Sequence, residues 1–189
     1  MSIIEAPTDS EATGLAAEFY ADDVRDQGFV GAHTRVMSMN PEALAAFETL
    51  IRAIVAQMDT RRYELVTLAA ALGARSQHCR LAHGRKSLKY FGEEQLFEIA
   101  RDYRHADLTD AEIAMMEFAQ RVSTDSSAMT DADSQRLRVL GFNDREIVDI
   151  ALAAAARNYY SRAIQALAVD VDTPPGLSDR LRDALVASI

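Results

Sequence analysis

Cysteine is nearly absent from this chain, and that scarcity narrows where the protein can work. Of 189 residues only Cys79 is a cysteine, so no disulfide can form within one chain and a reducing, cytoplasmic setting is expected. Residues 1–14 carry acidic side chains and no basic segment, which does not fit a secretory signal. The longest apolar run, residues 147–156, is interrupted by Asp149 and is too short to span a bilayer. No membrane association is therefore expected.

Clusters of basic residues and helix-breaking residues are also scarce. The formal net charge is −9, and the basic residues form only isolated pairs such as Arg61-Arg62 and Arg85-Lys86. This charge would repel a phosphate backbone, which argues against nucleic-acid binding. The chain has only 8 glycines and 4 prolines, while alanine is abundant. This composition favours helix throughout.

Helix signals are frequent along the chain. Asn40-Pro41 combines an N-cap residue with proline at the first helical position, and Thr109 with Glu112 forms a capping box. Apolar residues recur at helical spacing after such starts, and no convincing strand pattern appears. The stretch from Gly28 to Met39 is predicted to be extended or looped. We expect an all-α multi-helix bundle of roughly seven to nine helices.

Residues that can carry chemistry gather around the single cysteine. His78 precedes Cys79 and His83 follows it four residues later, whereas His33 and His105 fall outside this stretch. With Ser76 as N-cap, Cys79 occupies the third position of a helix, where free backbone N–H groups and the helix dipole stabilise an anion. Such a position favours the reactive thiolate.

A proton relay can be drawn from the same spacing. His83 lies one helical turn after Cys79 on the same face, close enough to exchange a proton directly or through one water. Glu64, on the preceding antiparallel helix, can fold back and orient His83. Together these residues form a carboxylate–imidazole–thiol chain, the general arrangement of an activated nucleophile.

The same residues also have plainer explanations. A single cysteine in a helix is more often a small apolar side chain, the two histidines are more often surface or hydrogen-bonded residues, and Glu64 could be an ordinary first-turn acid. A zinc site from His78, Cys79 and His83 is a weak alternative, because adjacent residues face different ways and structural zinc usually has a further ligand. We therefore expect no metal and no cofactor.

The motif Glu64-x11-Ser76-x-His78-Cys79-x3-His83 resembles the active-site motif of the alkylhydroperoxidase D-like (carboxymuconolactone decarboxylase) family. That motif reads Glu-x11-Cys-x-x-Cys-x3-His, often with His before the second Cys. Residues 29–41, 108–146 and 157–162 resemble the peroxidase-related branch of the family. The resemblance implies a helical domain of the alkylhydroperoxidase D-like type. The expected segments are an N-terminal extension with a short helix (1–28), this domain (29–171) and a C-terminal helix (172–189).

The resemblance also implies roles for the motif residues. The second cysteine of the family attacks peroxide, the first closes a disulfide, and Glu and His relay the proton. Carried over, Cys79 is the nucleophile, His83 and Glu64 are the relay, and His78 is an accessory polar group. Ser76 replaces the first cysteine and cannot close a disulfide. Oxidation would stop at the sulfenic acid unless an external thiol or a second subunit's Cys79 resolved it.

Three functions fit these residues, and an enzyme is expected. The main prediction is a thiol-dependent, peroxidase-like oxidoreductase that reduces hydroperoxides through Cys79 and is recycled by an external thiol reductant. A non-redox decarboxylase or lyase acting on a small lactone or organic acid would instead use acid–base chemistry at His83 and Glu64, with Arg75 or Arg80 as carboxylate anchor. A catalytically degenerate member would only bind a small molecule or assemble. The resemblance implies a homo-oligomer (dimer, trimer or hexamer).

Polar residues also interrupt the apolar helix that starts after Asn143. For Arg157, Asn158 and Arg162 we expect hydrogen bonds to backbone carbonyls or ion pairs with Asp149 or Glu146. The alternative is that they approach the Glu64–His83 site or a subunit contact. The C-terminal helix and the amphipathic helix from Ser10 have apolar faces; the first is suited to packing on a partner, and the second carries Leu15, Phe19 and Val24.

Overall fold

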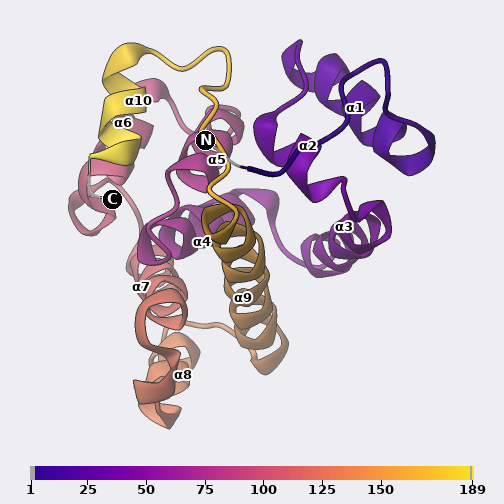
Figure 1. The fold of residues 1–189 in the computed structure, drawn as a ribbon. Coiled ribbons are helices and arrows are strands. Elements are labelled where there is room, and N and C mark those ends of the chain that lie inside the picture. The colour runs from indigo at the N-terminus through magenta and orange to yellow at the C-terminus, as the bar shows by residue number, and fades with distance from the viewer. Residues whose placement is uncertain (1–2, 188) are drawn as a thin grey trace.

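The structure, a computed structural model, describes residues 3–187 and 189. Over these residues the chain forms ten α-helices and two short 3-10 helices, with no strand (Figure 1). The all-α prediction is confirmed, although the helices outnumber the expectation. The elements are α1 (Gly14–Gln27), α2 (Ala32–Met37), α3 (Pro41–Val55), α4 (Thr60–Gly73), α5 (Gln77–Ser87), α6 (Glu93–Asp102), η1 (Tyr103–His105), α7 (Asp110–Asp125), η2 (Ser126–Ala128), α8 (Asp131–Val139), α9 (Asp144–Ala166) and α10 (Asp179–Val186).

Helix α4 lies at the centre of the molecule and packs against α5, α7 and α9. Every residue from 63 to 71 is buried, so this helix has no solvent face. Asp59 caps its N-terminus by accepting a hydrogen bond from the backbone N–H of Arg62. At its other end α7 comes very close, since a Cβ on Gly73 would lie 2.6 Å from the carbonyl oxygen of Gln120. This central position holds the side chains of α4 rigidly against α5.

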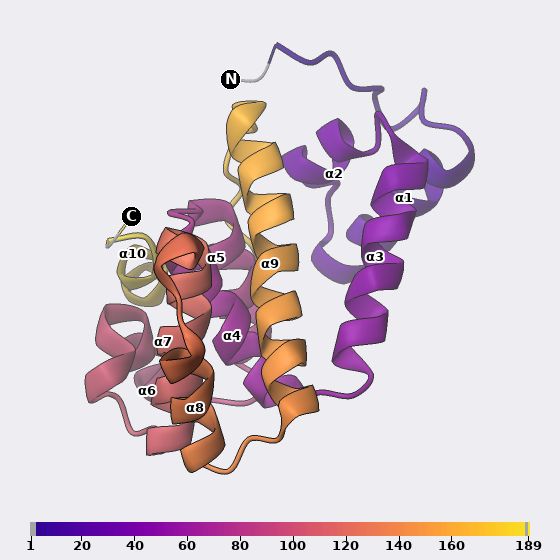
Figure 2. The ribbon, with the colours of Figure 1, turned by 90° about the horizontal axis from the view of Figure 1, so that it is seen from below.

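The three N-terminal helices gather on the far side of α9 from α7 (Figure 2). The stretch predicted to be extended or looped contains α2, so that expectation is wrong. The N-terminus of α2 is capped by a residue distant in sequence: the backbone N–H of Ala32 donates a hydrogen bond to the carboxylate of Asp172 at 2.6 Å. Helix α1 buries Phe19 with Ala16 and Tyr20, whereas Leu15 and Val24, predicted on the apolar face, are exposed. The large aromatic rings decide which face turns inward.

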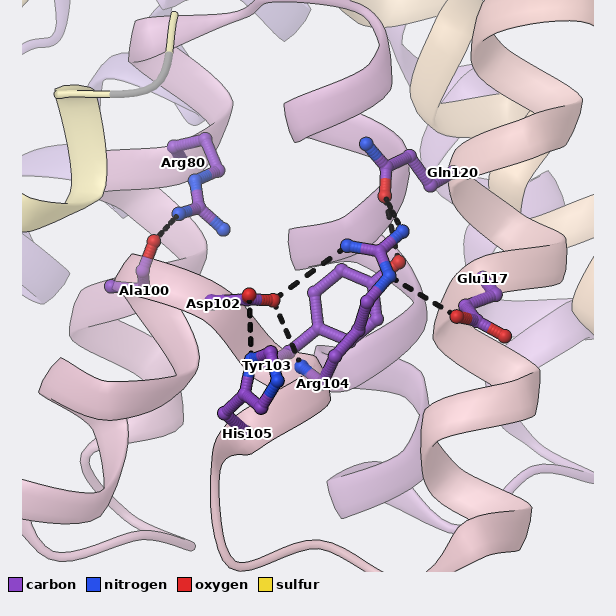
Figure 3. Close-up of polar contacts among 8 residues, drawn as sticks. All are labelled: Arg80, Ala100, Asp102, Tyr103, Arg104, His105, Glu117 and Gln120. Atoms are coloured by element: carbon purple, nitrogen blue, oxygen red, sulfur yellow. Dashed lines mark hydrogen bonds and ion pairs between the residues drawn. The ribbon is translucent and has the colours of Figure 1, made fainter.

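The C-terminal helix packs on its own chain rather than on a partner, which corrects the sequence expectation. Leu181 and Leu185 of α10 are fully buried against α5 and α6, and Gly84 leaves the space that Leu185 fills. Arg80 is also fully buried there and donates to the carbonyl oxygen of Leu185 at 3.0 Å. It donates as well to the carbonyl oxygen of Ala100 at 2.8 Å (Figure 3). Burial lowers the pKa of Arg80 to about 10. Arg80 therefore links α5 to α6 and α10 through hydrogen bonds and is not a carboxylate anchor.

The alanine-rich middle of α9 is buried on one side only. Ala153, Ala154 and Ala156 pack inward, whereas Val148, Leu152 and Tyr159 are exposed. The homo-oligomer and the segment boundaries stay predictions. None of the described helices combines the length and apolarity that crossing a membrane requires.

Candidate active site

Three of the candidate residues, His78, Cys79 and His83, meet at a cavity of about 470 Å³. Helices α4, α5 and α9 form one side of it, and the N-terminal helices α1, α2 and α3 form the other. Its volume falls within the range of small-molecule sites, about 300–1,000 Å³. The lining includes Phe19, His33, Leu44, Phe47, Ile51, Tyr63, His78, Cys79, His83, Lys86, Arg157 and Tyr160.

The start of α5 places the thiol at the cavity. Ser76 accepts a hydrogen bond from the backbone N–H of Cys79 at 3.4 Å, so it is the N-cap and Cys79 is the third helical residue, as predicted. Cys79 is only 1% exposed but lines the cavity, whereas Ser76 is buried outside the lining. The tight turn before Ser76 puts Arg75 at φ +56° with an exposed side chain away from the cavity. Arg75 is therefore not a carboxylate anchor either.

Two polar groups from α9 reach the sulfur. Ser161 donates to Sγ at 3.2 Å and Arg157 donates through Nη1 at 3.6 Å. Burial would lower the pKa of Arg157, but the neighbouring Cys79 and Tyr63 raise it above its ordinary value, so the guanidinium stays charged. A buried cation and a hydroxyl donor can both stabilise negative charge that develops on this sulfur.

Arg157 therefore follows the alternative prediction, that it approaches the Glu64–His83 site. The expected ion pairs with Asp149 and Glu146 are wrong, because those carboxylates pair with Arg145 and Arg62. Arg162 and Asn158 do bond to backbone carbonyl oxygens, those of Ser123 and Ala154, as expected.

Glu64 and His83 form a buried pair beside the thiol. His83 Nδ1 lies 2.7 Å from Glu64 Oε2 and 3.2 Å from the hydroxyl of Thr67, which itself donates to the carbonyl of Tyr63. Because the carboxylate can only accept, Nδ1 carries the proton and Nε2 keeps a lone pair. Among the described residues nothing bonds to Nε2, on a side chain that lines the cavity.

The ionisation of the pair suits a base. Burial, followed by the charge of Arg157, lowers the pKa of His83 to about 4, although Glu64 acts in the opposite direction. Burial pushes the pKa of Glu64 upward, but His83 and the cations Lys86 and Arg157 bring it below its ordinary value. At neutral pH the pair is therefore a carboxylate and a neutral imidazole.

No direct hydrogen bond joins Cys79 and His83 within the described residues; the sulfur's partners are Ser161 and Arg157. The two side chains nevertheless line the same cavity from one face of α5, one turn apart. Of the two routes predicted for proton exchange, transfer through one water is the one this arrangement accommodates.

A second pair of imidazoles lies on the cavity wall. The rings of His33, from α2, and His78 have centroids 4.1 Å apart at 50°. Burial lowers the pKa of His33 to about 4 and that of His78 to about 3, so both are neutral. His105 is exposed far from the cavity and pairs with Asp102 (Figure 3). No three His, Cys, Asp or Glu side chains in the described part of the chain lie together as a metal site.

The buried imidazoles make stability depend on pH. As pH falls from about 6.5 to about 4, unfolded histidines take up protons while His33, His78 and His83 stay neutral in the fold, so the free energy of unfolding falls. Above about pH 6.5 both states are neutral and this contribution is constant. For His83, a pKa lowered from 6.5 to about 4 is worth on the order of 3 kcal/mol.

Chemical denaturation at about pH 7 and about pH 4.5 measures this loss. The His33→Gln variant should lose less stability than the wild type, because it lacks one of the three buried imidazoles. A free energy of unfolding that stays constant over this window would contradict the assigned ionisation.

Neither a protein-family model nor a curated protein matches the chain. Solved structures do match over nearly its whole length. An uncharacterized peroxidase-related protein from Ralstonia eutropha JMP134, with an alkylhydroperoxidase AhpD core, is 21% identical with a TM-score of 0.80, over 98% of this chain and 96% of that one. A peroxidase-related protein from Silicibacter sp. TM1040 is 24% identical with a TM-score of 0.77, over 90% of this chain and 92% of that one. The debrominase Bmp8 is 17% identical with a TM-score of 0.77, over 99% of this chain and 98% of that one. The chain thus has the alkylhydroperoxidase D-like fold that its motif predicted.

Proposed function

We propose that the protein is a thiol-dependent peroxidase that reduces organic hydroperoxides through the single thiol of Cys79. The observation that carries the proposal is the environment of Sγ, which faces a cavity while a buried arginine and a serine donate to it. The hydrogen-bonded pair of Glu64 and His83 adds a base in the correct protonation state. Two structures of the same fold are named peroxidase-related, which also supports the proposal.

The oxidation step uses these groups in turn. His83 takes the thiol proton at Nε2 through one water, and Arg157 and Ser161 hold the resulting thiolate. The thiolate attacks the terminal oxygen of the hydroperoxide, the O–O bond breaks, and the alkoxide leaves with the proton from His83. The sulfur is oxidised to a sulfenic acid while the hydroperoxide is reduced to an alcohol.

Recycling requires thiols from outside the chain. Ser76 supplies no second sulfur, and Cys79 is too deeply buried for the Cys79 of another subunit to reach it. A small thiol can enter the cavity, attack the sulfenic sulfur and release water, which leaves a mixed disulfide. A second thiol then frees Cys79 and departs with the first as their disulfide. We therefore propose a small thiol as the reductant.

The alternative functions have less support. A decarboxylase or lyase was expected to anchor its substrate on Arg75 or Arg80, and neither lines the cavity. A Cys-to-Ala variant of the debrominase Bmp8 has been crystallised in complex with 2,3,4-tribromopyrrole. Reduction of a halogenated ring is therefore the second candidate, favoured here by the aromatic side chains of Phe47 and Tyr160 in the cavity.

Consumption of cumene hydroperoxide in the presence of a small monothiol tests the proposal. We expect multiple turnovers that need the thiol and vanish in the Cys79→Ser variant. The matched control is Ser76→Thr, which can still cap α5 and should retain turnover because Ser76 is not part of the proposed chemistry. No turnover with any small thiol, or equal turnover in Cys79→Ser, would contradict the proposal.

A further inference from the structure

One face of α5 runs along the whole depth of the cavity. Cys79, Ala82, His83 and Lys86 line it, and their spacing of three to four residues puts them on one side of the helix. Cys79 is buried whereas Lys86 is exposed, so the face leads from the floor of the cavity to its rim. At a rise of about 1.5 Å per residue, Lys86 stands about 10 Å further along the helix axis than Cys79.

Lys86 is the uncommitted charge at this rim. Within the described residues its ammonium group has no ion pair or hydrogen bond. The carboxylates that share the cavity lining have other partners: Asp23 accepts from the backbone N–H of Gly31 at 2.9 Å, and Glu48 pairs with Arg52 at 3.4 Å. Asp26, a carboxylate close to Lys86, pairs with Arg85 at 2.8 Å. Asp22 pairs with Arg25. Among the described residues that line the cavity, Lys86 is therefore a cation without a partner, while the carboxylates there are bonded to other groups.

The wall contributed by the N-terminal helices and α9 combines charged side chains with an apolar part. Phe47 and Tyr160 stack with ring centroids 5.0 Å apart at 28°, beside Leu44 and Ile51. This surface can cover the body of an organic molecule, and a cavity of about 470 Å³ is far larger than hydrogen peroxide requires.

We infer that the cavity selects amphipathic organic substrates with an anionic group, such as a carboxylate, which Lys86 binds at the rim while the reactive atom meets Cys79. The apolar body between the two ends lies against Phe47 and Tyr160. This inference rests on the proposed function only for the nature of the reactive atom. Binding of the anionic end can be measured without peroxide.

A maleimide whose nitrogen carries a hexanoate tail is a suitable probe, with its methyl ester as the neutral counterpart. The thiolate adds to the carbon–carbon double bond and a proton from water completes the neighbouring carbon, so no oxidant is needed. Rates of Cys79 modification are followed by intact mass on the full chain. The acid-to-ester rate ratio should fall about two- to fivefold in Lys86→Gln, as expected for an exposed ion pair.

The controls separate a local charge from the net charge. Lys86→Arg should keep the ratio, and Lys89→Gln, which removes the same charge outside the cavity lining, should leave it unchanged. The preference for the acid should also shrink as ionic strength rises. An equal ratio in wild type and Lys86→Gln, or failure of both maleimides to reach Cys79, would overturn the inference.

A second arm distinguishes this inference from the proposed function. A fatty-acid hydroperoxide and its methyl ester are compared as substrates with a small thiol. Turnover of both at equal rates in wild type would leave the peroxidase intact and overturn the anion preference. Turnover of neither, with the maleimide ratio still dependent on Lys86, would contradict the peroxidase and support the anion site.

Discussion

Replacing His83 with alanine is expected to lower kcat/KM for an organic hydroperoxide by about 10²–10⁴-fold, the range for loss of a general base and acid. The imidazole lies 2.7 Å from Glu64 and leaves Nε2 open to the cavity. It is neutral at pH 7 because burial lowers its pKa to about 4. The variant would lack both the base for the thiol and the acid for the leaving alkoxide.

Steady-state peroxide consumption measures this loss, and His105→Ala is the matched control because His105 is exposed and away from the cavity. Glu64→Gln should also lose activity, because an amide no longer dictates which nitrogen of His83 carries the proton. The loss should be smaller than in His83→Ala, because the imidazole ring stays in place. Because the pair acts as a unit, the double variant should be no worse than His83→Ala alone. Wild-type kcat/KM in His83→Ala would contradict the relay.

Replacing Arg157 with methionine is expected to slow alkylation of Cys79 at neutral pH by about 10- to 100-fold, the value of a hydrogen bond to a charged group. Arg157 is buried and donates to Sγ at 3.6 Å, so its loss leaves only the hydroxyl of Ser161 on the thiolate. The reaction of this variant should therefore be slower than that of the wild type throughout the pH profile, because the attacking sulfur has lost one of its two donors.

The pH profile of the iodoacetamide reaction separates this electrostatic effect from a general loss of structure. Arg157→Lys keeps the charge without the planar guanidinium and should give an intermediate profile. Arg162→Met removes an arginine from the same helix outside the cavity, so its profile should match the wild type. A profile in Arg157→Met that is also unchanged would contradict the assigned role.

The parts of the site that lie close in sequence were predictable. Ser76, Cys79 and His83 lie within eight consecutive residues of one helix start, and helical geometry alone fixes how their side chains are spaced. Glu64 could be added because a short turn makes α4 antiparallel to α5. Here the observed hydrogen bond to His83 matches the expectation from the motif.

The parts that come from distant segments could not be predicted. Ser161 lies 82 residues after Cys79, and only the packing of α9 against α5 brings its hydroxyl to the sulfur. His33 reaches His78 because α2 is a helix, and α2 is capped by Asp172, 140 residues away. Arg80 was misassigned for a related reason. His78 and Cys79, directly before it, line the cavity, but Arg80 turns instead toward the carbonyl oxygens of α6 and α10.

These contacts also bear on the missing cysteine of the motif. Ser76 stays within the helix cap, and the polar partners of the thiol come instead from α9. A thiol supported in this way can be activated without a neighbouring sulfur, but it depends on outside thiols for reduction. This makes the oxidised state of Cys79 the point at which the proposed cycle should pause.

The most direct test is the intact mass of the protein after one equivalent of an organic hydroperoxide, with no thiol present. The account predicts a gain of one oxygen atom, located on Cys79, reversed by a small thiol and absent from the Cys79→Ser variant. An unchanged mass, or an added oxygen that persists in Cys79→Ser, would contradict it.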